Sequence, residues 1–304
     1  MSSSFAPILL FTYKRLDTLK QTVSALQANQ LAAESDLFIF SDAGKTEQDQ
    51  MVVENIRKFL KTITGFRKIE IYEAEKNKGL ASSIISGVSK VIEQYGRVIV
   101  LEDDLETTPN FLLFMNTCLD KYQKNDAVFS ISGYSFNLGE EKRESLDAYF
   151  LNRGWSWGWA TWQDRWTSVD WQVSDYATFV KNAKARKMFA KGGSDLNKML
   201  DTQMAGKLDS WAIRWFYHQF RINGLTIYPV FSKVYNDGFD ANATHTTGSS
   251  SRYQPSLDRT HKTQFNLPDS IEVSPYYQSQ FQKKMGIWSR IVSKVETIYQ
   301  KIIK

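Results

Sequence analysis

The feature that most constrains the fold is a regular alternation of apolar runs and amphipathic segments in the first third of the chain. Four runs have the length of a strand and three intervening segments place apolar residues at helical spacing: strands at 7–13, 36–42, 68–72 and 97–101, and helices at 15–30, about 47–62 and about 80–94. Repeated units of this kind predict an α/β protein with a mostly parallel, Rossmann-like sheet and helices on both faces. The crossovers are expected to be right-handed.

The alternation stops near residue 105. Beyond it, a tryptophan-dense stretch is preceded and followed by weaker elements: a helix near 109–122, a strand near 127–133, and helices near 174–190 and 209–222. The segment from Asn236 to about Ser274 is polar and is predicted to be a long, mobile loop. A last helix is expected over about 279–303. No Pro- or Gly-rich linker separates the halves, so we expect them to share one core.

Composition narrows the class of protein. Of the 304 residues, 42% are hydrophobic and 23% are charged, which is the balance of a globular chain, and the net charge of +5 permits an anionic partner without requiring one. The single cysteine, Cys118, lies in an apolar helical pattern and cannot form an internal disulfide, which favours a reducing compartment. No secretory signal is recognised, and no run approaches the roughly 18 to 20 apolar residues that span a bilayer. We therefore expect a cytoplasmic protein.

Three consecutive carboxylates, Glu102-Asp103-Asp104, follow directly on the buried strand at 97–101. In open α/β sheets, ligands bind in the crevice beyond the strand ends. Three adjacent like charges are costly unless a cation binds there, and Mg²⁺ or Mn²⁺ takes carboxylate and phosphate oxygens together. The alternative is an acidic start to a helix that opens near Pro109.

The other strand ends also carry polar side chains: Thr12, Tyr13 and Arg15 after the first, Ser41 and Asp42 after the second, and Asn77, Lys78 and Gly79 after the third. This mixture suits a nucleoside diphosphate, because Arg and Lys bind phosphate while a carboxylate accepts from ribose or a base. Individually these residues could be solvated charges or a turn. There is no P-loop, no G-x-G-x-x-G, no G-x-S-x-G and no His-Cys metal cluster, so a bound metal is the natural way to neutralise a diphosphate.

In order and spacing, these segments resemble the GT-A fold glycosyltransferases, which transfer a sugar from a nucleotide-sugar donor. The resemblance rests on Ile8 to Arg15, Ser41-Asp42, Asn77 to Ala81 and Glu102-Asp103-Asp104, and it covers roughly residues 7–245. The acidic run corresponds to the D-x-D metal motif of that fold. The form of Val100 to Glu106 and the segment Gly154-Trp155-Ser156-Trp157-Gly158 are most similar to the N-acetylglucosaminyltransferase I type.

The resemblance implies roles for the residues of the donor site. Asp104 would bind the metal, Glu102 and Asp103 would face the donor ribose and sugar, and Arg15 and Asp42 would hold the nucleoside and its phosphate. Thr12, Tyr13 and Lys78 would complete the nucleotide-sugar site. His245 matches a position that faces the diphosphate in the family, although a lone histidine in a polar loop can simply be exposed.

On the acceptor side, the resemblance implies inversion at the anomeric carbon, with a carboxylate that deprotonates the acceptor hydroxyl. The segment Lys207 to Trp211 matches the family's base segment, and Asp209 is its carboxylate, although the family has two adjacent aspartates there. Asp209 could instead cap the helix that follows. Among six crowded tryptophans, most of which we expect in the core, Trp155 and Trp157 are the candidates for stacking on sugar.

The sequence therefore predicts a metal-dependent (Mn²⁺ or Mg²⁺), inverting hexosyl- or N-acetylhexosaminyltransferase. It would use a UDP-sugar and a glycan or lipid-linked acceptor, in bacterial surface glycan synthesis. A sugar-phosphate nucleotidyltransferase is the alternative enzyme, but it needs a Gly-rich loop after the first strand. A non-catalytic carbohydrate-binding protein is the third reading, and no nucleic acid partner is expected.

The expected organisation is a GT-A catalytic domain over residues 1–278 and a basic amphipathic helix over 279–304. Within the domain we expect a nucleotide-sugar-binding half over 5–105, an acceptor-side half over 106–250 and a loop over 251–278. The last helix carries apolar residues on one face and lysines and arginines around the rest. Such a helix can dock on an anionic membrane, here the inner face of the plasma membrane, or pack on the domain or a partner.

Overall fold

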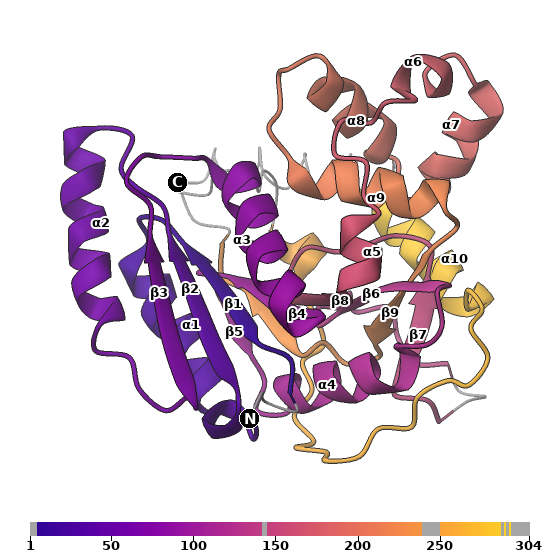
Figure 1. The fold of residues 1–304 in the computed structure, drawn as a ribbon. Helices are drawn as coiled ribbons and strands as arrows, with labels where there is room; N and C mark the ends of the chain where they lie inside the picture. The colour runs from indigo at the N-terminus through magenta and orange to yellow at the C-terminus, as the bar shows by residue number, and fades with distance from the viewer. Residues whose placement is uncertain (1–4, 142–144, 239–249, 287–288, 290–291, 293–304) are drawn as a thin grey trace.

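The computed structural model describes the whole chain except residues 1–4, 142–144, 239–249, 287–288, 290–291 and 293–304. An eight-stranded sheet with the order β3-β2-β1-β4-β8-β6-β9-β7 forms its centre. Figure 1 shows the β1–β4 half on the left and the β6–β9 half on the right, with α6 (Tyr176–Phe179), α7 (Ala183–Phe189) and α8 (Leu196–Met204) grouped above α9 (Trp211–Arg221). The predicted α/β fold with helices on both faces is confirmed.

The first half consists of parallel strands joined by helices: β1 Ile8–Thr12, α1 Leu16–Gln27, β2 Asp36–Ser41, α2 Glu47–Leu60, β3 Lys68–Glu73, α3 Leu80–Tyr95 and β4 Arg97–Glu102. Side chains alternate between the two faces of each strand. In β1, Ile8 and Leu10 pack with α1, α2 and α4, whereas Leu9 and Phe11 pack with α3 and α9. The strand ends that carry the predicted site therefore lie between two apolar layers.

The second half is a mixed sheet with these further elements: β5 Leu105–Thr107, α4 Phe111–Tyr122, β6 Val128–Ser132, β7 Ala148–Leu151, β8 Trp159–Trp162, α5 Gln163–Thr167, α8 Leu196–Met204, α9 Trp211–Arg221, β9 Leu225–Pro229, β10 Val234–Asn236 and α10 Pro275–Met285. Strand β8 runs antiparallel to β4 and β6, and β7 runs antiparallel to β9, while β6 and β9 are parallel. Three short 3₁₀ turns complete the assignment: η1 Ala32–Glu34, η2 Ala190–Gly192 and η3 Ser250–Tyr253.

Two helix predictions need correction. The helix predicted over 174–190 is broken into α6 Tyr176–Phe179 and α7 Ala183–Phe189, because the Asn182 side chain caps α7 by accepting from the Ala185 amide at 3.0 Å. The last helix begins at Pro275 instead of about 279, with Ser274 as its N-cap. Most of its predicted extension lies outside the described residues.

The tryptophans and the long polar segment lie against the domain. Trp159, Trp166 and Trp215 are buried between the sheet and α9, and Cys118 is buried as predicted. Residues 250–274 form few regular elements, as predicted, yet they are held by long-range hydrogen bonds such as that from the Tyr122 hydroxyl to the Pro268 carbonyl at 2.7 Å. Among the helices described, none is long and apolar enough to cross a membrane.

Candidate active site

The ends of β1 and β4 lie side by side, and hydrogen bonds join their polar residues. Asp103 accepts hydrogen bonds from the Thr12 hydroxyl at 2.8 Å and from the Tyr13 amide at 3.1 Å. The Asp104 carboxylate accepts one from the Arg15 guanidinium, with Nη1 2.9 Å from Oδ2. The structure thus brings together residues that the sequence places at two separate strand ends.

The acidic run does not start a helix. Glu102 ends β4, a short turn carries Asp103 and Asp104, and β5 follows at once, whereas α4 begins only at Phe111. The alternative of an acidic helix N-terminus is therefore wrong. Side-chain alternation places Glu102 on the face of β4 that packs toward α3 and α9, the face it shares with Val98 and Val100.

The carboxyl groups of Glu102, Asp103 and Asp104 are removed from solvent and lie close to one another. Burial raises the pKa of Glu102, Asp103 and Asp104, and the charge of Asp104 raises the pKa of the other two further. The pKa of Asp103 reaches about 6, although hydrogen bonds from Thr12 and Tyr13 act in the opposite direction. Arg15 opposes the rise at Asp104. The cluster therefore holds more negative charge than its surroundings stabilise, which favours a cation.

A carboxylate that the sequence did not suggest lies beside this cluster. Strand β10 pairs antiparallel with β5, and the Asp237 amide that follows β10 donates to the Asp104 carbonyl at 2.9 Å. The charge of Asp237 is close enough to raise the pKa of Asp104. Gly238 is also required here, because a Cβ at this position would lie 2.2 Å from Asp104 Oδ2. The only sequence signal is the pair Asp237-Gly238 at the edge of the polar segment.

Asp42 fixes the start of α3. Its carboxylate accepts hydrogen bonds from the backbone amides of Lys78, at 2.9 Å, and Gly79, at 3.0 Å. Gly79 adopts a φ of +75°, which favours glycine over other residues. The predicted residues Asp42 and Lys78 are therefore neighbours, joined through the backbone, and the Lys78 side chain remains exposed.

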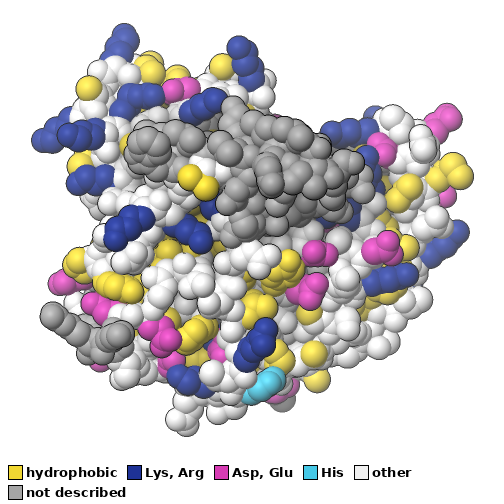
Figure 2. All heavy atoms as spheres, turned by 180° about the vertical axis from the view of Figure 1, so that it is seen from behind, with side chains coloured by type: hydrophobic (Ala, Val, Ile, Leu, Met, Phe, Trp, Pro, Cys, Tyr) yellow, Lys and Arg dark blue, Asp and Glu magenta, His cyan; other side chains and the backbone are white. Residues whose placement is uncertain are grey.

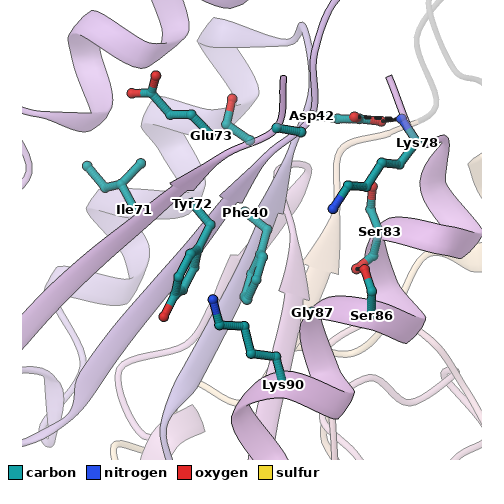
Figure 3. A pocket seen from close by; sticks show the side chains of 12 residues that line it. Phe40, Asp42, Ile71, Tyr72, Glu73, Lys78, Ser83, Ser86, Gly87 and Lys90 are labelled. Carbon is teal, nitrogen blue, oxygen red and sulfur yellow. Dashed lines mark hydrogen bonds between the residues drawn. The ribbon is translucent and has the colours of Figure 1, made fainter. Parts of the chain in front are cut away.

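A pocket of about 370 Å³ extends from this point between α3 and the edge of the sheet. Figure 3 shows Asp42 and Lys78 at one end, with Phe40, Tyr72 and Lys90 further along. The Phe40 and Tyr72 rings stack with their centroids 4.9 Å apart, and the Lys90 ammonium lies 3.9 Å from the centre of the Tyr72 ring. The pocket thus has an aromatic wall and cationic groups at both ends.

Tyr13 is fixed by a second carboxylate that sequence reasoning missed. Its hydroxyl donates to Asp49 at 3.1 Å and accepts from the Lys45 amide at 3.2 Å. Asp49 lies in the first turn of α2, where its amide donates to the capping Thr46 side chain. No local sequence pattern links residue 13 to residue 49, because the contact depends on the pairing of β1 with β2.

Asp209 precedes α9 and lies beside the start of α3. Its side chain is 65% exposed and lies 3.7 Å from the Arg214 guanidinium. A Cβ built on Gly79 would be 3.7 Å from Asp209 Oδ2, so the carboxylate lies next to the Asp42–Gly79 contact. The cap of α9 is Ser210, whose hydroxyl accepts from the Ile213 amide at 3.3 Å. The alternative role of Asp209 as the helix cap is therefore wrong.

The sugar-contact candidates lie in an aromatic cluster. Trp155 is 6% exposed and stacks on Tyr134 with centroids 5.6 Å apart. Its buried Nε1 has no hydrogen-bond acceptor among the described residues. Trp157 is half-buried and contacts Tyr134 and Tyr253. Gly154 is required by packing, because a Cβ there would lie 2.5 Å from Phe216.

His245 lies outside the described residues. Its predicted position near the diphosphate therefore stays a prediction. The sugar-binding roles of Trp155 and Trp157 also stay predictions.

The donor set at the β4 end fits a divalent metal, because carboxylate oxygens are its preferred ligands and the cluster has excess negative charge. Within the part of the chain that the structure describes, no group of three or more His, Cys, Asp and Glu side chains is arranged as a metal site. A metal held by the described side chains would therefore need further ligands from water or substrate oxygens.

A Rossmann-like sheet with carboxylates and basic groups at its strand ends is the arrangement expected of a glycosyltransferase of the GT-A fold. Residues 8–181, more than half of the chain, match the family described as "Glycosyl transferase family 2", and the protein belongs to this family. The predictions of the fold family and of the enzyme class are thereby confirmed. The similarity to the N-acetylglucosaminyltransferase I type remains a resemblance. No curated protein matches the sequence.

Solved structures show limited similarity. A crystal structure of S. aureus TarS 1-349 matches with 12% identity and a TM-score of 0.43, over 77% of this chain and 60% of that one. The mannosyltransferase PcManGT from Pyrobaculum calidifontis, in complex with GDP-Man and Mn²⁺, matches with 10% identity and a TM-score of 0.30, over 45% of this chain and 40% of that one. A UDP-glucose pyrophosphorylase complexed with UDP-glucose matches with 14% identity and a TM-score of 0.38, over 76% and 93%. None of these similarities assigns a substrate to this chain.

Proposed function

We propose that the protein transfers a sugar from a UDP-sugar to a hydroxyl group, with inversion at the anomeric carbon and with a divalent metal. The observation that carries this proposal is the position of Asp209 beside the Asp42–Gly79 contact, at the same sheet edge as the Asp104–Arg15 pair. Groups suited to a diphosphate and a carboxylate suited to an acceptor hydroxyl thus lie near one another. Hexosyl or N-acetylhexosaminyl transfer in bacterial surface glycan synthesis is the form we favour.

Two groups are expected to stabilise the departing diphosphate. Asp104 would hold the metal, with Asp237 and Asp103 beside it. A bound divalent cation would offset the charge that builds on the leaving group. Arg15 donates to Asp104, and its guanidinium would also bind the phosphate oxygens of the donor.

The acceptor oxygen attacks the anomeric carbon as the bond from that carbon to the phosphate oxygen breaks. Asp209 takes the proton of the attacking hydroxyl, and UDP leaves with the bonding electron pair. An exposed carboxylate can reach an acceptor that enters from solvent, which agrees with the 65% exposure of the Asp209 side chain. Glu102 and Asp103 would face the donor sugar and ribose, and Asp42 and Lys78 the nucleoside.

The metal-dependent part is tested with Asp104→Asn, using Glu54→Gln, an exposed carboxylate on α2, as the control. With wild type and control, UDP and Mn²⁺ together should raise the unfolding temperature, because a ligand at about 100 times its Kd adds about 2.7 kcal/mol. Asp104→Asn should lose this shift and lose UDP-sugar turnover. Full wild-type turnover in EDTA, or an unchanged Mn²⁺-dependent shift in Asp104→Asn, would remove the metal from the proposal.

We also propose that the C-terminal segment binds an anionic membrane and so brings the enzyme to a lipid-linked acceptor. Tyr277, Phe281 and Met285 of α10 pack into the core, but they precede the apolar stripe of the predicted helix, which begins at Trp288. That stripe lies outside the described residues apart from Val292, which is 54% exposed, so membrane docking and packing both stay predictions. A chain shortened to residue 286 keeps Tyr277, Phe281 and Met285, and it should sediment with anionic vesicles less than the full chain. Equal sedimentation would contradict the proposal.

A further inference from the structure

A row of lysines lies on the outer side of α7 and continues into η2. Lys184 and Lys187 are spaced at i and i+3, so they share one face of α7; Lys191 follows in η2, and Lys181 precedes the helix. All four side chains are exposed. The opposite face is closed, because Phe189 is buried against aromatic neighbours. The lysines therefore face solvent, while the opposite face of α7 packs against the domain.

Two acidic residues close to this helix in the chain, Asp195 and Asp201, form ion pairs with arginines. Asp201 forms a two-point ion pair with Arg186, at 2.9 and 2.8 Å. Asp195 forms a similar pair with the buried Arg153. None of the lysines forms an ion pair with a residue that the structure describes. The local positive charge is therefore not neutralised within the described chain.

Two large apolar side chains stand among the lysines. Val180 is 38% exposed and Met188 is 43% exposed, and Met188 lies one turn after Lys184. Figure 2 shows lysine and arginine side chains gathered at the upper left, over α6 to α8, with hydrophobic side chains between them. A surface that mixes cations with protruding apolar groups differs from a simply solvated charged face.

Helix α10 adds to the same surface. The side-chain amides of Gln278 and Gln282 both donate to the Lys191 carbonyl, at 3.2 and 3.3 Å. Lys283, on the same helix, is exposed. Lys181, Lys184, Lys187, Lys191 and Lys283, with Val180 and Met188, form what we call the lysine face.

We propose that the lysine face binds the surface of a bilayer that contains anionic phospholipids. Lysines complement the headgroup charge, and Val180 and Met188 can enter the boundary between headgroups and acyl chains. A soluble polyanion would bind the lysines but would make no favourable contact with Val180 and Met188. The proposal goes beyond the donor chemistry and does not depend on it.

The test compares two triple variants of the full chain by sedimentation with vesicles at low salt. Lys184→Gln/Lys187→Gln/Lys191→Gln removes three charges from the lysine face, and Lys20→Gln/Lys58→Gln/Lys124→Gln removes three exposed charges from other surfaces. Vesicles contain one part phosphatidylglycerol to two parts phosphatidylcholine. Each lysine near the surface contributes about fivefold, so the first variant should bind on the order of 100-fold more weakly while the second changes little. Equal losses in both variants, or none in either, would overturn the proposal.

A second comparison separates a bilayer from a soluble polyanion. Val180→Ser/Met188→Ser keeps every charge, and it should bind vesicles several-fold more weakly while binding inorganic polyphosphate as wild type does. If this variant matches wild type on vesicles, the bilayer proposal fails. UDP-sugar hydrolysis without vesicles should be unchanged in all these variants, so a failure of the catalytic proposal would be seen separately.

Discussion

Asp209 and Ser210 are adjacent, but the structure gives them different tasks. Ser210 caps α9, whereas the Asp209 carboxylate lies beside Gly79 and 3.7 Å from the Arg214 guanidinium. Asp209→Asn should therefore lower the turnover number by orders of magnitude, with little change in UDP affinity or unfolding free energy, because a general base acts on the acceptor in the transition state. Steady-state kinetics with a UDP-sugar, UDP titration and urea unfolding measure the three quantities.

Ser210→Ala provides the matched control. Loss of the cap should lower the unfolding free energy by about 1 kcal/mol and leave turnover within a few-fold of wild type at a temperature where the variant is folded. If Asp209→Asn instead costs stability and keeps its turnover, the base lies elsewhere and Asp209 is structural.

For single residues, the sequence predicts which side chains cluster at the strand ends better than it predicts which aromatic side chains face a ligand. The Asp104–Arg15 and Asp103–Thr12 contacts follow from one rule, that parallel strands end at the same edge, so the sequence was sufficient to propose that they cluster. Trp155 is of a residue type that often stacks on sugars, but its ring is packed against Tyr134. Residue type alone cannot distinguish a tryptophan in the core from one that faces a ligand.

At the scale of elements, α9 is anchored along its length, and His218 is one of the anchors. Its Nδ1 accepts from the Asp170 amide at 3.3 Å, and its Nε2 lies 3.2 Å from the Ser168 hydroxyl. Burial lowers the pKa of His218 below its usual 6.5, despite the opposing charges of Asp170 and Asp175. A protonated ring would also lose the hydrogen bond at Nδ1.

This lowered pKa predicts the pH dependence of stability. As the pH falls below 6.5, the unfolded chain takes up the proton before the folded one does, so the unfolding free energy falls until the lower folded pKa is passed. The slope from this group is at most about 1.4 kcal/mol per pH unit. Urea unfolding across this range should show a shallower fall for His218→Gln than for wild type, with exposed His261→Gln as the control. Identical slopes for all three proteins would contradict the assignment.

Elements of the first half were predictable because each has its own local pattern. Helix α3, for example, was expected over about 80–94 and spans Leu80–Tyr95. Strands β7, β8 and β9 were not predicted, since their conformation depends on pairing across the sheet with strands that are distant in sequence. The approach of Asp237 to Asp104 has the same origin, because it follows from the pairing of β10 with β5.

At the scale of the whole molecule, the polar segment after residue 250 acts as a clamp on the catalytic domain. The Asp258 amide donates to the Ser232 carbonyl at 2.9 Å, and its carboxylate pairs with the Lys233 ammonium. Both side chains are almost fully buried. Lys233 immediately precedes β10, the strand that places Asp237 beside Asp104. The segment was predicted to be a mobile loop because of its polar composition. It instead contributes the buried Lys233–Asp258 ion pair, next to the strand that leads to the candidate metal site.

The strength of the clamp can be measured. Burial opposes charge on Asp258, but hydrogen bonds from Lys233, Thr260 and Asn110 outweigh it and keep the pKa of this carboxyl below its usual value. Asp258→Ala removes the partner and leaves the Lys233 ammonium buried alone, which should cost about 3–5 kcal/mol of unfolding free energy.

Lys233→Met/Asp258→Leu removes both charges and keeps apolar volume, so it should be much more stable than Asp258→Ala. Urea unfolding of wild type, Lys233→Met, Asp258→Leu and the double variant gives the coupling energy. If Asp258→Ala costs less than about 1 kcal/mol, or if the single and double variants are equally destabilised, the segment after residue 250 is not held by this ion pair and the position of β10 must be set by its pairing with β5 alone.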